Sequence, residues 1–291
     1  MIDLHAHTTF SDGASTPAAL LQEARLAGLQ ALAITDHDTF AGFDAAQPLA
    51  SRHPLELVCG LELSTQISAQ QPGRKTTVHL LGYFLDQMPS AHFREWLTTI
   101  SSTRQQRNLK MMAYLQANKL SIEWADLPLP PASLSRTHFA RVLVAKKLVP
   151  DHQSAFDRYL SDAVLPGIER KLPSLAEGIE KIRGAGGLPS LAHPVRLPYR
   201  EPLALRSFIQ EMSGCGLEAL EVYHSDHNAE NVGQFLNLAR EFDLLVTGGS
   251  DYHGENKPDI RLGRGRGDLS LPYTLLANMK KRLQNRRASY S

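Results

Sequence analysis

Seven short apolar runs, rich in Leu, Ile, Val and Ala, constrain the fold of this chain more than any other feature. They occupy residues 2–4, 31–35, 57–63, 77–84, 188–192, 217–223 and 244–248. Their hydrophobicity is mostly continuous rather than alternating, which is typical of strands buried on both faces, as in parallel sheets. Strands that alternate with helices form either an α/β barrel or a doubly wound sheet, and seven strands favour the barrel.

Helix signals lie between these runs. In residues 15–28 a hydroxyl side chain precedes Pro17 and the pattern stops at Gly28, which is the usual punctuation of a helix. Residues 174–185 and 231–242 are predicted as further connecting helices. The glycine-rich residues 184–187 precede a strand rather than a helix, so we interpret them as a turn and not as a phosphate-binding loop.

Residues 91–170 break the alternation and are predicted to form a helical insert. Helical stretches at 93–118, 137–147 and 154–162 are interrupted by prolines at positions 128, 130 and 131. We predict a barrel from residues 1–90 and 171–291, with the insert as a cap over the substrate. Residues 101–170 carry ten Lys or Arg against six Asp or Glu. This basic excess suits an anionic substrate, and a solvated helical face without a partner is the alternative.

The composition narrows the class of protein further. The 291 residues are 42% hydrophobic with a net charge of +1, which excludes a disordered chain. No apolar run approaches the roughly 20 residues of a membrane helix, so we expect no membrane partner. The first residues lack the charged and apolar regions of a signal peptide. Cys59 and Cys215 make no disulfide framework, which fits the cytoplasm.

The basic stretches 261–267 and 280–287 are predicted to be flexible and solvated, and holding an oligonucleotide is the alternative.

Ligand-type side chains recur at or near the ends of six of the seven runs. They are His5, His7, His37, Glu62, His79, His193, Asp251 and His253. In barrel enzymes the carboxyl ends of the strands are where sites are built. His5 and His7 are two residues apart on a strand, so both rings can reach one ion. Nitrogen and oxygen ligands without cysteine suit Mn²⁺, Zn²⁺ or Fe²⁺ better than Mg²⁺ or Cu(I).

In its order and spacing this motif set resembles the PHP family, named for polymerase and histidinol phosphatase. The resemblance covers nearly all of the chain outside the insert. Its motifs are His5-x-His7, Asp12, Thr35-Asp36-His37, Glu62, His79, His193-Pro194 and Ser250-Asp251-x-His253. Within that family, the insert and its segment 134–138 resemble the branch of 3',5'-nucleoside bisphosphate phosphatases and 5'-3' exoribonucleases.

The resemblance implies a distorted (β/α)7 barrel with two or three metal ions, Mn²⁺ in the first place and Zn²⁺ or Fe²⁺ as alternatives. One ion would be bound by His5, His7, Glu62 and Asp251, and a second by Glu62, His79 and His193. A third would be bound by Asp12, His37 and His253. Many relatives carry histidine in place of Asp12, so the alternative is that Asp12 and His37 contact the phosphate instead.

The resemblance also implies hydrolysis of the 3'-phosphate of a nucleoside 3',5'-bisphosphate, with a metal-activated hydroxide as nucleophile. Short 5'-phosphorylated RNA is the alternative substrate, and a C–N amidohydrolase or a non-catalytic metal module is less favoured. Catalytic roles are predicted for His193, His224, Asp12 and His37. Besides Asp12 and His37, the predicted substrate contacts are Arg104, Arg107, Ser135, Arg136, His138, Arg196 and His224.

Overall fold

The computed structural model describes residues 1–50, 54–68, 75–128, 134–161, 164–165, 168, 170–267 and 269–288. Residues 130, 131 and 162, which belong to the predicted insert pattern, lie outside these ranges. The chain divides into two compact units, residues 1–94 with 173–291 and residues 95–172. Each unit is described by itself.

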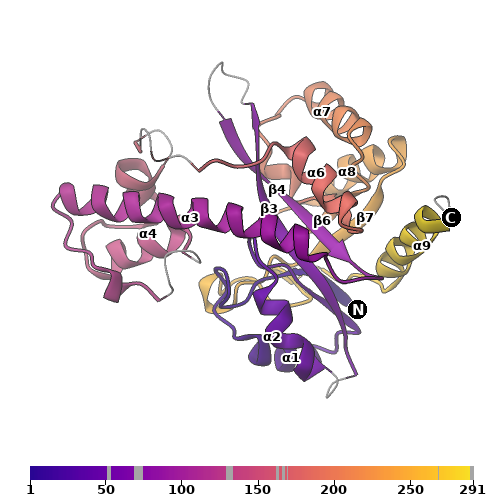
Figure 1. Cartoon of the computed structure of the whole chain (residues 1–291), viewed down its shortest axis with the longest axis horizontal. Coiled ribbons are helices and arrows are strands. Elements are labelled where there is room, and N and C mark those ends of the chain that lie inside the picture. The colour runs from indigo at the N-terminus through magenta and orange to yellow at the C-terminus, as the bar shows by residue number, and fades with distance from the viewer. Residues whose placement is uncertain are drawn as a thin grey trace. The chain divides into compact units, whose positions relative to one another are not determined.

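The larger unit contains one seven-stranded sheet whose strands lie in chain order, from β1 to β7 (Figure 1). The strands are β1 (Ile2–Ala6), β2 (Ala31–Ile34), β3 (Glu56–Ser68), β4 (Lys75–Phe84), β5 (Leu188–Leu191), β6 (Ala219–His224) and β7 (Leu245–Gly249). A bridge between Ala6 and Tyr252 joins the first strand to the residues after the last. The fold is therefore the mixed α/β, nearly closed barrel that the sequence predicts.

One strand does not follow the expected parallel arrangement. β4 pairs antiparallel with both β3 and β5, whereas the other neighbours in the sheet are parallel. Continuous hydrophobicity reports burial on both faces and not strand direction, so the sequence could not distinguish the two. The reversal places His79, in the middle of β4, opposite Ser64 in the second half of β3, two residues beyond Glu62. His79 thus reaches the same edge of the barrel as the ends of the parallel strands.

Helices surround the barrel. They are α1 (Pro17–Leu26), α2 (Ala41–Ala50), α6 (Leu175–Gly184), α7 (Pro202–Gly214), α8 (Ala229–Glu241) and α9 (Thr274–Ala288). Of these α6 packs on β3 to β5 and α8 on β6 and β7, as Figure 1 allows the reader to follow. The predicted hydroxyl cap of α1 is present, since Thr16 accepts the Ala19 N–H, and Ser174 likewise accepts the Glu177 N–H at the start of α6.

A bulge in β1 changes which side chains enter the barrel. Asp3 pairs with Leu32, but Ala6 pairs with Ile34. Between these two pairs β1 therefore has one residue more than β2. In a regular strand Leu4 and His5 point to opposite faces. The extra residue interrupts this alternation. Leu4 then lies in the apolar core, and the next residue, His5, lies in the polar cluster at the carboxyl ends of the strands.

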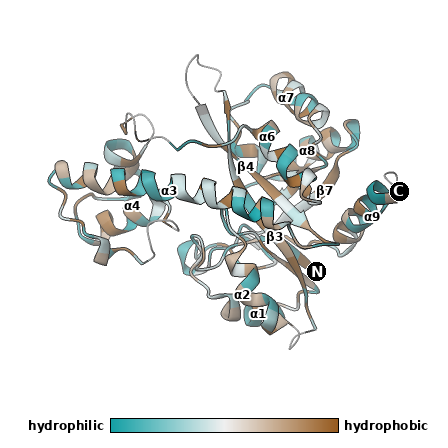
Figure 2. Ribbon diagram, viewed as in Figure 1, coloured by the Kyte–Doolittle hydropathy of each residue, from teal (hydrophilic) through white to brown (hydrophobic). Residues whose placement is uncertain are grey.

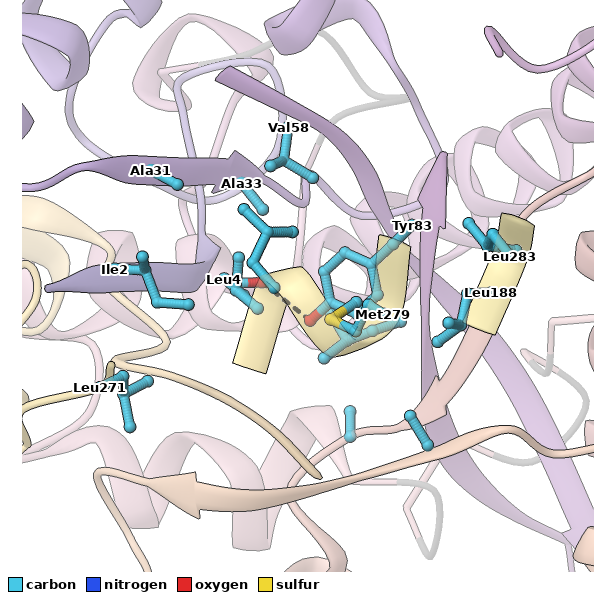
Figure 3. Packing of buried hydrophobic residues seen from close by; sticks show 14 residues of the cluster. Ile2, Leu4, Ala31, Ala33, Val58, Tyr83, Leu188, Leu271, Met279 and Leu283 are labelled. Atoms are coloured by element: carbon cyan, nitrogen blue, oxygen red, sulfur yellow. Dashed lines mark hydrogen bonds between the residues drawn. The ribbon is translucent and has the colours of Figure 1, made fainter. Parts of the chain in front are cut away.

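The apolar core of the barrel is covered by α9. Leu276, Met279 and Leu283 of this helix pack with Leu4 and Tyr83 of the barrel (Figure 3). The Tyr83 hydroxyl donates to the Leu4 carbonyl at 2.9 Å, so the buried phenol has a partner.

The prediction that residues 280–287 are flexible and solvated is wrong, because they belong to α9. Figure 2 shows α9 changing from mostly hydrophobic to mostly hydrophilic toward the C-terminus. Its cations form ion pairs with the barrel, Lys280 with Glu56 and Arg286 with Glu218. Only a narrow apolar stripe in an otherwise charged helix marks its buried face, which is why the sequence signal was weak.

The smaller unit is helical. It holds most of α3 (Ala91–Ala117), α4 (Arg136–Ala145), α5 (His152–Ala155), a 3-10 turn at Trp124–Asp126 and a π-helical turn at Phe156–Leu160. Its apolar core includes Met111, Leu115, Phe139 and Leu143. Across the described ranges of the chain, no helix has the length and apolar character that crossing a membrane requires.

Truncating the core face of α9 should destabilise the barrel. Leu276 is fully buried, so Leu276→Ala is expected to lower the free energy of unfolding by about 2–5 kcal/mol, measured by urea denaturation. Leu203→Ala on α7 is the matched control, since Leu203 is 78% exposed, and it should change stability by less than roughly 0.5 kcal/mol. Equal effects of the two changes would contradict the packing of α9 on the barrel.

Candidate metal centre

Five imidazole rings surround the buried carboxylate of Glu62 at the end of the barrel where the parallel strands finish. From Glu62 Oε2 the distances are 3.4 Å to His5 Nε2, 3.3 Å to His7 Nε2 and 3.1 Å to His37 Nδ1. From Oε1 they are 2.8 Å to His79 Nδ1 and 2.9 Å to His193 Nε2. Each oxygen of this one carboxylate therefore faces a separate group of nitrogen atoms, which is the arrangement that two neighbouring cations require.

Asp251 completes the first of these groups. Its Oδ1 lies 3.5 Å from His5 Nε2 and 3.4 Å from His7 Nε2, and these two rings with Glu62 and Asp251 form a buried quartet of ligand type. A second carboxylate, Asp12, lies beside the quartet, with Oδ1 3.2 Å from His253 Nε2 and Oδ2 3.7 Å from His37 Nε2.

The structure thus brings together all nine side chains that the sequence singled out as metal ligands. His37 differs in its grouping, because its two ring nitrogens face two carboxylates. Its Nδ1 lies with Glu62 and His79 in one possible cation site, and its Nε2 faces Asp12. His7, Asp12 and His253 form a further group, and His5 also lies in a group with Glu221 and His224.

Buried hydrogen bonds hold the loops that carry these ligands. Asp36 accepts the Thr8 N–H at 2.8 Å and the Ser11 hydroxyl at 2.6 Å, which fixes the loop after β1. Asp38 accepts the N–H and the hydroxyl of Ser64 at 2.6 and 2.9 Å, which ties the end of β2 to β3. The two aspartates that flank His37 thus hold the backbone of Thr8 and of Ser64 in place.

Three of the six described non-glycine residues with positive φ lie at the same place. Asp38, His193 and Asp251 have φ values of 58°, 26° and 56°, in the left-handed region that residues other than glycine rarely occupy. Gly249 lies two residues before Asp251, and a Cβ at Gly249 would lie 2.4 Å from the His5 backbone nitrogen. The close approach of β7 to β1 therefore requires glycine, and it brings Asp251 beside His5.

The protonation states fit ligands for a cation. Burial lowers the pKa of His37 and of His193 to about 3, so both rings are neutral at pH 7. The surrounding imidazoles outweigh burial and hold the pKa of Glu62 well below its usual range. Burial opposes a charge on His7, but Asp251 and Glu62 raise its pKa to about 9. A cation that bound there would displace that proton.

Unpartnered buried atoms provide the test of whether a metal fits. Within the described ranges, His5 Nε2, His7 Nε2, His37 Nδ1 and Asp12 Oδ1 have no hydrogen-bond partner. The opposite nitrogen of His5, Nδ1, lies 2.9 Å from Glu221 Oε1, so a carboxylate orients this ring. Leaving buried polar atoms unpaired costs about 1–3 kcal/mol each, and a bound cation would supply the missing partner. The residues fit a metal.

The predicted substrate contacts are distributed over both units. In the larger unit, Arg196 donates to Asp226 Oδ2 and to Asp251 Oδ2, the latter at 3.1 Å, and His224 Nε2 lies 3.4 Å from the same Asp251 oxygen. In the smaller unit, the Arg107 guanidinium donates to Asn108 and to the Leu134 carbonyl.

The other predicted contacts of the smaller unit lie on α3 and at the start of α4. Arg104 is buried on α3, Ser135 is the N-cap of α4, and Arg136 and His138 lie in its first turn. The Ser135 N–H donates to His138 Nδ1 at 3.0 Å.

Sequence reasoning missed two groups at the metal centre. Lys257, whose Nζ lies 2.7 Å from Asp251 Oδ2, follows the last motif by four residues and belongs to no recognisable pattern. Glu221 holds His5 and also accepts the His193 N–H at 2.7 Å. Glu221 does have a signal, because it lies on the sixth apolar run, three residues before His224, where an acidic side chain must be buried.

Comparison with known proteins identifies the family. Residues 3–187 match the PHP domain family, and the chain belongs to it. It is 32% identical over 267 residues to a 3',5'-nucleoside bisphosphate phosphatase of Chromobacterium violaceum, covering 89% of this chain and 90% of that protein. It is 29% identical over 252 residues to a 5'-3' exoribonuclease of Haemophilus influenzae, covering 86% and 89%.

A solved structure agrees in fold. The crystal structure of a proposed metal-dependent phosphoesterase from Bifidobacterium adolescentis is 31% identical and superposes with a TM-score of 0.78, covering 97% of this chain and 96% of that one. The clustered ligands and these relatives together make the protein a metal-dependent phosphoesterase of the PHP family, that is, a hydrolase.

Removing the shared carboxylate should abolish stabilisation by metal. Mn²⁺ at 100 times its dissociation constant is expected to stabilise the folded protein by about 2.7 kcal/mol, read as a rise in melting temperature that a chelator reverses. Glu62→Gln should lose this rise, because both groups of imidazoles depend on that carboxylate. Glu230→Gln, on the exposed surface of α8, is the matched control and should keep it. A full Mn²⁺ response in Glu62→Gln would refute the shared site.

Proposed function

We propose that this protein removes the 3'-phosphate of nucleoside 3',5'-bisphosphates, for example converting adenosine 3',5'-bisphosphate to AMP and phosphate. The observation that carries the proposal is the carboxylate of Glu62 surrounded by five imidazoles, with the cation Arg196 on the neighbouring carboxylate of Asp251. The bisphosphate phosphatase of Chromobacterium violaceum, matched over about nine-tenths of both chains, supports this choice of substrate.

The nine ligand-type side chains would hold two or three cations, with Mn²⁺ as the proposed metal and Zn²⁺ or Fe²⁺ as alternatives. Bound there, the cations would polarise a phosphoryl oxygen and lower the pKa of a water molecule. Asp12 and His37 face each other across 3.7 Å and are proposed to contact either the third cation or the phosphate.

Other residues of the chain are proposed to hold and orient the substrate. Arg196 would bind the transferred phosphate through its guanidinium, whose planar donors match phosphate oxygens. His224, on the same side of Asp251, would donate a hydrogen bond to the substrate or a proton to the leaving oxygen. His193 is proposed to bind one of the metal ions that take part in catalysis. In the smaller unit Arg104, Arg107, Ser135, Arg136 and His138 are proposed to bind the nucleotide or its second phosphate.

A 5'-3' exoribonuclease acting on short 5'-phosphorylated RNA is the second candidate. The similarity to the Haemophilus influenzae exoribonuclease favours it, and the same metal ligands would serve both reactions. An amidohydrolase is less favoured, because those enzymes usually bridge their metals with a carboxylated lysine, a role that Glu62 would take here. Both cysteines are free thiols, which supports a cytoplasmic location.

Substrate comparison tests the proposal. The Mn²⁺-loaded protein should release phosphate from adenosine 3',5'-bisphosphate with a higher kcat/KM than it releases mononucleotide from a 5'-phosphorylated trinucleotide. His193→Ala should reduce the rate on the order of a hundredfold or more, while His92→Ala, at an exposed position, should leave it unchanged. Phosphate release that is the same before and after His193→Ala would remove the enzyme hypothesis, and a reversed substrate order would favour the exoribonuclease.

The smaller unit should contribute to nucleotide affinity. Arg136→Ala is expected to raise KM for adenosine 3',5'-bisphosphate about tenfold or more, because a charge-assisted hydrogen bond to phosphate is lost. An aryl phosphate, which has neither nucleoside nor second phosphate, should keep its KM. Arg158→Ala, at an exposed position of the same unit, is the control. An equal loss with both substrates would show that Arg136 does not read the nucleotide.

A further inference from the structure

Three nitrogen donors from different loops converge on one oxygen atom, Asp251 Oδ2. Lys257 Nζ lies 2.7 Å from it, Arg196 Nη2 lies 3.1 Å from it, and His224 Nε2 lies 3.4 Å from it. The other oxygen, Oδ1, faces the imidazoles of His5 and His7. Asp251 therefore separates the metal ligands on one side from a group of positive and hydrogen-donating side chains on the other.

His224 indicates that this group is built for an anion. The Asp226 N–H donates to His224 Nδ1 at 3.0 Å, so the proton of the neutral ring lies on Nε2. That Nε2 is buried and has no hydrogen-bond partner among the residues that the structure describes. The acceptor oxygen that faces it, Asp251 Oδ2, is 3.4 Å away and also faces two cationic side chains, so a ligand oxygen placed here would give this buried donor a closer partner.

The two cations differ in how much of their charge is compensated. Arg196 is held by two carboxylates, since Asp226 accepts from its Nε and Nη2 atoms and Asp251 accepts from Nη2. Lys257 contacts one acidic side chain, Asp251, within the described part of the chain. Asp251 also faces the metal ligands, so its charge is shared with whatever they bind. Lys257 keeps the larger uncompensated charge.

Lys257 also has more N–H donors than its contact with Asp251 uses. An ammonium group carries three N–H donors, and the side chain is 31% exposed, so it extends from the buried carboxylate to the surface. Its position is fixed by its own backbone, whose N–H donates to the Gly254 carbonyl in the turn Gly254–Asn256 after His253. The ammonium group of Lys257 is therefore both in contact with a candidate metal ligand and open to a ligand from solvent.

We propose that Lys257 binds the substrate's terminal phosphate and makes the site prefer a doubly charged phosphomonoester over a singly charged phosphodiester. The attraction between a fixed cation and a ligand doubles when the ligand's charge doubles. Lys257 thereby acts on substrate choice, while Arg196 and His224 supply directional hydrogen bonds. This inference rests on the proposed phosphoester hydrolysis, but its binding test does not require turnover.

The test compares Lys257→Met with Lys257→Arg and with Lys281→Met, an exposed lysine of α9, all in the Mn²⁺-loaded full chain. Three quantities are measured: the bound Mn²⁺ per chain, the affinity for inorganic phosphate by calorimetry, and kcat and KM for p-nitrophenyl phosphate and bis-p-nitrophenyl phosphate. The binding measurement stands even if the wild-type protein hydrolyses neither ester, an outcome that would count against the proposed function alone.

Lys257→Met is expected to weaken phosphate binding about tenfold or more with the Mn²⁺ content unchanged. Its KM should rise for the monoester and change by less than about threefold for the diester, and Lys257→Arg should restore most of the affinity. Lys281→Met should behave as the wild type. A parallel loss of Mn²⁺, or phosphate binding unchanged at full Mn²⁺ content, would show that Lys257 serves only to orient Asp251 and would overturn the proposal. Should Lys257→Met fail to fold, Lys257→Gln takes its place under the same criteria.

Discussion

Burial of the Glu62 carboxylate among five imidazoles is the constraint on which the rest of the larger unit depends. An ionised group in the interior of a protein is costly unless opposite charge or hydrogen-bond donors surround it. His5, His37 and His79 are among the groups that keep Glu62 ionised, although burial alone would neutralise it. A barrel provides this surrounding, because its strands finish in a ring and each brings a side chain to the same small volume.

The scaffold accepts local strain to make that ring. A bulge in β1 re-aims His5, the backbone of Asp251 takes a left-handed conformation, and Gly249 lets β7 approach the backbone of β1. The cost is offset at the opposite end of the barrel, where α9 packs Leu276 and other apolar side chains onto the core. Stability and chemistry are thus divided between the two ends of one sheet.

Asp251 links the metal ligands to the groups that would meet a substrate. One of its oxygens faces imidazoles and the other faces Lys257 and Arg196. A single carboxylate thus contacts both the candidate metal ligands and the cationic side chains proposed to bind phosphate. Asp226 extends the arrangement to Arg266, so loops after three different strands share it.

The amino-acid sequence by itself determined the number of strands, the cap of α1 and the ligand-type residues, because periodicity, capping chemistry and residue type are local properties. It could not determine that β4 runs antiparallel, since burial on both faces looks the same in either direction. Nor could it reveal that the basic C-terminal stretch is a helix paired with Glu56 and Glu218.

Tertiary structure alone decided that His37 lies between Glu62 and Asp12, and that Lys257 lies against Asp251. Both facts depend on where loops from strands far apart in the chain end in space. Such positions are set by the closure of the barrel, and no local pattern of residues encodes them.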